Sequence, residues 1–133
     1  AQSSEAIVAR LGIEGLDWKI CYQSRVTPVK WLGPPVESEI RRAGADRVPI
    51  IIVPISFVSE HVETLVELDE TMRDLAATAG VPHFSRLSAV RTDPVFINAL
   101  AGFTEFLRDK RTPCSADGSR ICPAKFGKCP HAA

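Results

Sequence analysis

Val48-Pro49-Ile50-Ile51-Ile52-Val53 is the stretch of sequence that decides the fold. A continuous apolar run of this kind is typical of a strand buried on both faces, as in a parallel sheet covered by helices. Pro49 then stands at the start of the strand, where a missing hydrogen-bond donor is tolerated. Further along, Ser59 is a suitable N-cap for a long helix that runs to about residue 79, and Gly80 is a suitable C-terminal stop.

Helical and strand patterns alternate along the whole chain. We predict helices over residues 4–11, 37–43, 59–79 and 94–108, and strands over residues 18–23, 48–53 and 84–87. This alternation predicts an α/β fold, a three-layer sandwich with a parallel sheet. Three strands are few for that architecture, so we expect a partner half outside this sequence.

The last predicted helix has clear end signals and one apolar face. Asp93 is a good cap, and Pro94 suits the first helical position. We expect a buried stripe made of Phe96, Ile97, Leu100, Phe103 and Leu107.

Composition argues against several classes of protein. The chain has 133 residues, with 16 Lys and Arg against 16 Asp and Glu, and therefore no formal net charge. A nucleic-acid binder normally carries a basic excess to neutralise phosphates, so we expect no nucleic-acid partner. The apolar runs are far shorter than the roughly 20 residues of a membrane-spanning helix, which leaves peripheral membrane contact open. No signal-peptide pattern is visible. We predict one domain over residues 1–110 and a tail over residues 111–133.

Two acids and a histidine lie where the second strand ends and the long helix begins. They are Glu60, His61 and Glu63. Ligand sites of open α/β sheets gather at the carboxyl ends of strands. Glu63 could take a proton or hold a divalent cation, and His61 could ligate a metal or shuttle protons. Acids are also common caps in a first helical turn, so the local pattern alone does not decide between capping and function.

The tail carries three cysteines beside prolines: Cys114, Cys122 and Cys129. The tail has few apolar residues, and thiolates that hold a metal or cluster can order such a segment. Their spacing is not that of a zinc finger. A disulfide, free thiols or a zinc site completed by His131 are the alternatives. We place Cys21, the fourth cysteine, in the core.

Aromatic and basic residues surround the first loop. Tyr22, Arg25 and Trp31 could hold a flat anionic ligand at the strand end. The alternative is structural, with Trp31 packed on the sheet edge and Arg25 a surface charge.

Two ordered blocks resemble a known family. Tyr22-Gln23-Ser24-Arg25-Val26, followed by Trp31-Leu32-Gly33-Pro34, resembles the QS(R/K)xG…WLGP block of ferrochelatases. The stretch Val53-Pro54-Ile55-Ser56-Phe57-Val58-Ser59-Glu60-His61-Val62-Glu63-Thr64-Leu65 resembles their VPI(A/S)FxSDHIETL block. The similarity continues through Gly80 and Asp93-Pro94-Val95-Phe96, and so covers nearly the whole chain.

The resemblance implies an enzyme that inserts ferrous iron into protoporphyrin IX to make protohaem. It implies a Rossmann-like fold of two similar halves, of which this chain is the C-terminal one. By position, Glu63 is a catalytic acid that also meets the iron substrate, and His61 is a second catalytic histidine. Tyr22, Phe57 and Trp31 fall on substrate-binding positions.

The resemblance has limits. Thr27 replaces the usual glycine, and Glu60 replaces the usual aspartate. Some family members bind a 2Fe–2S cluster through a cysteine-bearing extension, which the tail with Cys114, Cys122 and Cys129 resembles. The resemblance further implies a cytoplasmic, membrane-associated location in bacteria or the mitochondrial matrix side in eukaryotes. Two alternatives stay open: a cobalt or other class II tetrapyrrole chelatase, and a non-catalytic iron–sulfur or metal-binding module.

Overall fold

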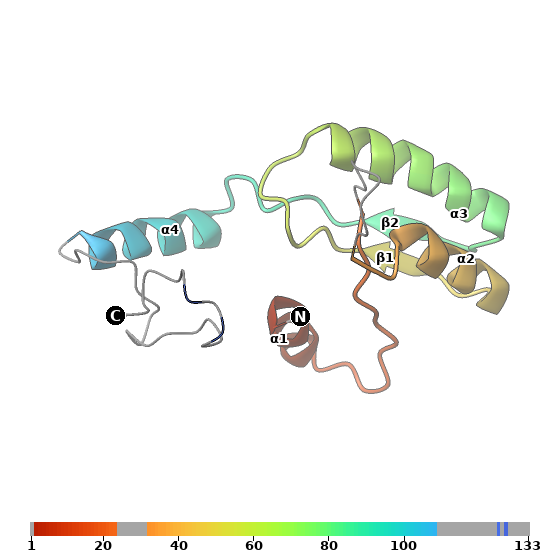
Figure 1. The fold of residues 1–133 in the computed structure, drawn as a ribbon, viewed down its shortest axis with the longest axis horizontal. Helices are drawn as coiled ribbons and strands as arrows, with labels where there is room; N and C mark the ends of the chain where they lie inside the picture. Colours follow the sequence, from red (N-terminus) through yellow and green to blue (C-terminus); the bar gives the residue numbers. More distant parts are fainter. Residues whose placement is uncertain (1, 24–31, 109–124, 126, 128–133) are drawn as a thin grey trace. The chain divides into compact units, whose positions relative to one another are not determined.

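The computed structural model of the chain describes residues 2–23, 32–108, 125 and 127 (Figure 1). These residues divide into two compact units, Ala1–Arg91 and Thr92–Ala133. The predicted boundary between residues 110 and 111 lies outside the described residues.

The first unit is built around a short parallel sheet. Strand β1 (Ile50–Ile52) pairs with β2 (Phe84–Arg86), with Ile50 opposite Phe84 and Ile52 opposite Arg86. Parallel strands need a long crossover between them, and the helical segment from residue 62 to residue 79 supplies it. The parallel pairing of the second and third predicted strands is therefore confirmed, although each is only three residues long.

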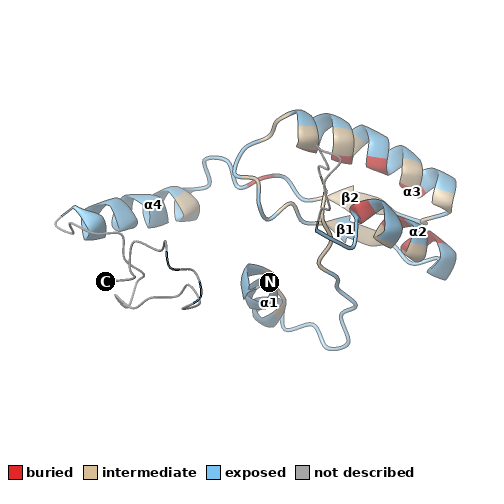
Figure 2. Cartoon of the chain, viewed as in Figure 1, coloured by how far each residue is buried: buried red, intermediate tan, exposed pale blue. Residues whose placement is uncertain are grey.

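Two helical segments pack on one face of this sheet. They are α2 (Val36–Asp46) and the continuous pair η1 (Glu63–Met72) and α3 (Arg73–Ala79). Figure 2 shows the buried positions on these helices. The core consists of Val36, Ile40, Leu68, Met72 and Ala76, against which Ile50, Ile52 and Phe84 pack.

The opposite face of the sheet is open in the described part of the chain. Successive strand residues point to opposite faces, and Ile51, between the two packed isoleucines, is 70% exposed. The described residues thus form an α/β unit with one helical layer on the sheet. The second helical layer of the predicted sandwich stays a prediction.

A glycine lets α2 approach α3 closely. A Cβ atom added at Gly44 would lie 2.2 Å from the carbonyl oxygen of Ala79 and 2.9 Å from its Cβ. Gly44 itself is buried. No side chain fits at this crossing without moving one helix.

The crossover helix differs from the prediction at its start. Residues 63–72 are π-helical, with i→i+5 hydrogen bonds, before α3 returns to α-helical geometry. Ser59 is not its cap, because the helix begins only at Val62, and residues 53–61 form turns instead. Its end is as predicted: Gly80 is left-handed, with φ 85°, and its N–H bonds back to the last helical turn.

The predicted first strand, residues 18–23, is wrong. In its place the chain makes one isolated bridge, in which the Tyr22 N–H donates to the Pro34 carbonyl at 2.9 Å and the Val36 N–H donates to the Tyr22 carbonyl at 3.0 Å. Pro34 and Pro35 carry no amide hydrogen, so a ladder cannot continue beside Tyr22.

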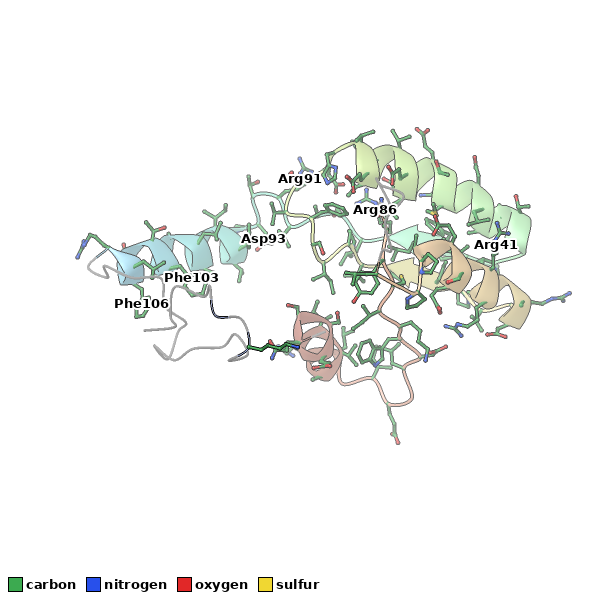
Figure 3. The ribbon with its side chains drawn as sticks, in the orientation of Figure 1. Arg41, Arg86, Arg91, Asp93, Phe103 and Phe106 are labelled. Atoms are coloured by element: carbon green, nitrogen blue, oxygen red, sulfur yellow. The ribbon has the colours of Figure 1, made fainter. Side chains whose placement is uncertain are left out.

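The remaining helices are α1 (Gln2–Leu11) and α4 (Pro94–Leu107). Both were predicted, and Asp93 caps α4 by accepting from the Val95 N–H at 2.9 Å. The buried stripe on α4 is wrong for the described residues, because only Phe96 is half-buried. Phe103 and Phe106, labelled in Figure 3, are 58% and 45% exposed. No described helix has the length and apolar character to cross a bilayer.

The close crossing at Gly44 predicts whether an added methyl group raises or lowers the free energy of unfolding. Gly44→Ala should lower the free energy of unfolding by about 1–3 kcal/mol, because the added methyl group overlaps the Ala79 backbone. Gly102→Ala on α4 is the matched control: nothing lies within 4 Å of the added Cβ, so the usual helix-propensity gain of about 1 kcal/mol applies. Urea unfolding of both variants measures this, and a stabilised Gly44→Ala variant would contradict the packing described.

Candidate functional site

A buried threonine fixes the turn that carries the acid and the histidine. Thr64 is fully buried. Its hydroxyl oxygen accepts from the His61 N–H at 3.0 Å and lies 3.0 Å from the His61 carbonyl, to which the hydroxyl donates. The N–H groups of Thr64 and Leu65 donate to the same carbonyl. The backbone of His61 is therefore held on both sides, a role that sequence reasoning did not assign to Thr64.

The His61 ring is held by two contacts. Its edge-to-face partner is Phe57, with ring centroids 4.5 Å apart and planes at 73°. Its Nδ1 atom accepts from the Glu63 N–H at 3.3 Å. Because Nδ1 uses its lone pair here, the neutral ring carries its hydrogen on Nε2. Phe57, His61 and Glu63, three of the predicted site residues, thus lie together at the start of η1.

Gln23 joins the first loop to this helix. Its side-chain nitrogen donates to the Glu63 carbonyl at 3.1 Å and to Glu67 Oε2 at 2.9 Å. Tyr22, the preceding residue, is half-buried and held by its bridge to Pro35. The segment that carries Tyr22 is therefore tied to the turn that carries Glu63, a contact between the two sequence blocks that the sequence alone did not predict.

The other predicted site residues are not part of this arrangement. Trp31, Cys114, Cys122 and Cys129 lie outside the described residues. Cys21 packs against the core, as predicted, although not in a strand. Burial and then the nearby Glu39 and Glu37 carboxylates raise the pKa of its thiol, which keeps it protonated.

Arg86, labelled in Figure 3, lies at the end of β2 and holds two carboxylates beside the same turn. Arg86 donates to Asp69 through Nε at 2.7 Å and Nη2 at 2.5 Å, and its Nη1 lies 3.1 and 3.0 Å from the two Glu60 oxygens. Glu60 also accepts from the Ala89 N–H at 2.8 Å. The Arg86 side chain is only 7% exposed. We call Arg86, Glu60, Asp69 and the Ala89 N–H the Arg86 network.

The Arg86 network holds its acids ionised. The Thr64 hydroxyl, the Ala89 N–H and Arg86 lower the pKa of Glu60 from 4.5 to about 2. Arg86 likewise lowers the pKa of Asp69, and the two carboxylates raise the pKa of Arg86. Sequence reasoning placed Glu60 beside His61 and Glu63 without deciding between capping and function. It assigned no role to Arg86 or Asp69, because the network joins residues 17 and 26 positions apart.

The described residues contain no group of three His, Cys, Asp or Glu side chains placed to hold a metal ion. A divalent cation that reached Glu63 would therefore need further donors from outside the described residues. The arrangement offers instead a carboxylate and an oriented imidazole beside an aromatic ring, which suits proton transfer at a flat ligand.

The parallel sheet, its helical crossover and this acid–histidine turn define an α/β domain with a candidate site at the carboxyl ends of its strands. Comparison with known proteins specifies the family, since the Ferrochelatase family model matches residues 1–106. The chain belongs to the ferrochelatase family, as the two sequence blocks predicted.

Relatives agree with this assignment over most of the chain. The ferrochelatase of Phenylobacterium zucineum is 48% identical over 128 residues, which cover 96% of this chain and 37% of that protein. The ferrochelatase of Rickettsia felis is 47% identical over 96% of this chain and 38% of its own length. That of the Wolbachia strain from Drosophila simulans is 52% identical over 75% of this chain and 31% of its own. The matched part of the chain thus spans between 31% and 38% of the length of these curated relatives.

The Arg86 network predicts a loss of stability in acid. Because folding lowers the pKa of Glu60, its contribution is complete above pH 4.5 and disappears as the pH falls toward 2. Asp69 shifts in the same direction. The free energy of unfolding, measured by urea denaturation, should therefore fall across this pH window, and Glu60→Gln should flatten the fall. An equal slope in both proteins would contradict the assignment.

Proposed function

We propose that this chain is the C-terminal part of a ferrochelatase that inserts ferrous iron into protoporphyrin IX to give protohaem. The observation that carries the proposal is the His61–Glu63 turn, with Phe57 on the histidine ring, in a chain of this family. The reaction exchanges two pyrrole protons for one Fe²⁺ ion. The site must therefore accept protons next to a flat, apolar macrocycle.

Glu63 is the proton acceptor in this proposal. Its carboxylate follows directly on the N-terminal end of the crossover helix, where the helix dipole favours negative charge. An ionised carboxylate can take a pyrrole proton and attract the incoming cation. Iron is a substrate here, and further donors would come from the rest of the enzyme.

His61 serves beside it as a hydrogen-bond donor. With Nδ1 bonded to the Glu63 N–H, the neutral ring carries its hydrogen on Nε2 and can donate it to a ligand. Ligation of a metal through Nε2 would require that hydrogen to move to Nδ1, which would break the contact with the Glu63 N–H. This contact therefore supports the donor role over the alternative that His61 is an iron ligand.

Three aromatic residues complete the proposed substrate site. Phe57 already packs on His61, and Tyr22 lies beside Gln23, which bonds to the helix. We assign Trp31 to the same function from its place in the first sequence block. Aromatic faces suit a porphyrin because they stack on its extended π-system.

We propose that the partner half belongs to the same enzyme and completes a Rossmann-like, three-layer sandwich. The exposed sheet face around Ile51 and the exposed apolar side of α4 support this, because each exposes apolar surface that a complete domain would bury. The coverage of only 37% of a relative agrees with it.

The 2Fe–2S cluster on Cys114, Cys122 and Cys129 stays a proposal from the sequence pattern, and no step of the reaction is assigned to it. The full-length protein, purified without oxygen, should show visible absorption and acid-labile sulfide, and Cys122→Ser should remove both. A colourless, sulfide-free protein would contradict the cluster.

Glu63→Gln tests the proposed function. In the full-length enzyme, turnover with ferrous iron and protoporphyrin IX should fall by about 100-fold or more, because the amide cannot accept the proton. Glu70→Gln, an exposed acid on the same helix, is the matched control and should keep wild-type turnover. Normal turnover in Glu63→Gln would contradict the assignment. Assays of the wild type with cobalt and other divalent metals, and with other tetrapyrroles, test the alternative chelatase.

A further inference from the structure

The two acids of the Arg86 network lie on either side of the proposed catalytic turn along the chain. Glu60 precedes His61, and Asp69 lies six residues after Glu63, inside the π-helical segment. One guanidinium, at the end of β2, bonds to both carboxylates. The stretch that carries His61, Glu63 and Thr64 is thus tied at both ends to a single side chain of the sheet.

A π-helical segment needs such support more than an α-helix does. Its i→i+5 hydrogen bonds form a rare geometry that occurs mostly in short pieces at functional sites. This one extends over ten residues. Of its residues, Asp69 makes the two-pronged contact with Arg86, a geometry that fixes orientation as well as distance.

The backbone and the side chain of Arg86 are both well fixed. Arg86 lies opposite Ile52 in the parallel ladder, and its side chain is almost fully buried. The guanidinium also donates to the Leu87 carbonyl at 3.2 Å, so its own place is constrained. A side chain held in this way can fix the position of the helix relative to the sheet.

We infer that Arg86 is a positioning residue for the His61–Glu63 turn, acting through Glu60 and Asp69 rather than by touching substrate. The inference rests on the proposed function only for its consequence in catalysis. The proton acceptor must meet the macrocycle in a defined place, and a misplacement of about 1 Å can cost roughly 100-fold in rate.

Arg86→Lys in the full-length enzyme tests this role. Lysine keeps the charge but cannot bond to both carboxylates in the two-pronged way. We expect kcat to fall at least tenfold while the KM for porphyrin changes less than threefold. Arg42→Lys is the matched control, because Arg42 also bonds to three acids, Asp17, Glu39 and Asp46, but on the exposed side of α2. It should leave kcat unchanged.

A second readout separates this inference from the proposed function. Amide hydrogen exchange over residues 61–68 should be at least tenfold faster in Arg86→Lys than in wild type, with the α2 amides unchanged. This measurement needs no activity. If the wild type inserts no iron, the proposed function fails, and the exchange result still decides whether Arg86 holds the turn.

The outcomes that overturn the inference are specific. Unchanged kcat in Arg86→Lys, or exchange that rises equally across all helices, shows an arginine that serves overall stability alone. If Arg86→Lys does not fold, as judged by circular dichroism, Asp69→Asn replaces it, because that variant keeps the Arg86–Glu60 pair. Wild-type kcat and exchange in Asp69→Asn would likewise overturn the inference.

Discussion

The parallel pairing of β1 with β2 is the constraint on which the other features depend. It requires a crossover between the strands, and it brings the carboxyl ends of both strands to one edge. The loop after β1 leads to His61 and Glu63, while β2 ends on Arg86. Residues distant in sequence therefore meet at that edge, where His61 and Glu63 lie beside the Arg86 network.

Much of this fold could be predicted because its signals are local. The isoleucine run indicates a strand through its own side chains, although only one face of that strand is packed in the described residues. Asp93 with Pro94 and the left-handed Gly80 define helix ends within a few residues, so both were predictable. The candidate site was predictable from the paired sequence blocks, and the structure places Phe57, His61 and Glu63 together.

Several of the features that the sequence did not predict depend on interactions between residues far apart in the chain. Ser59 has the chemistry of a cap, yet the helix begins at Val62, where Thr64 binds the His61 backbone from inside the helix. Residues 18–23 have strand-forming side chains, but their partner is a segment with two prolines. Nothing in the local sequence pattern distinguishes a π-helix from an α-helix. The Arg86 network forms only when the pairing of β1 with β2 brings its residues together.

The two prolines opposite Tyr22 also affect whether this segment can pair with strands of other molecules. An unpaired strand edge with a regular row of amide donors can recruit an extended segment of another molecule, the first step of edge-to-edge aggregation. Pro34 and Pro35 remove two successive donors from the segment beside Tyr22. The feature that ends the ladder inside this protein therefore also makes the segment a poor template for intermolecular β-structure.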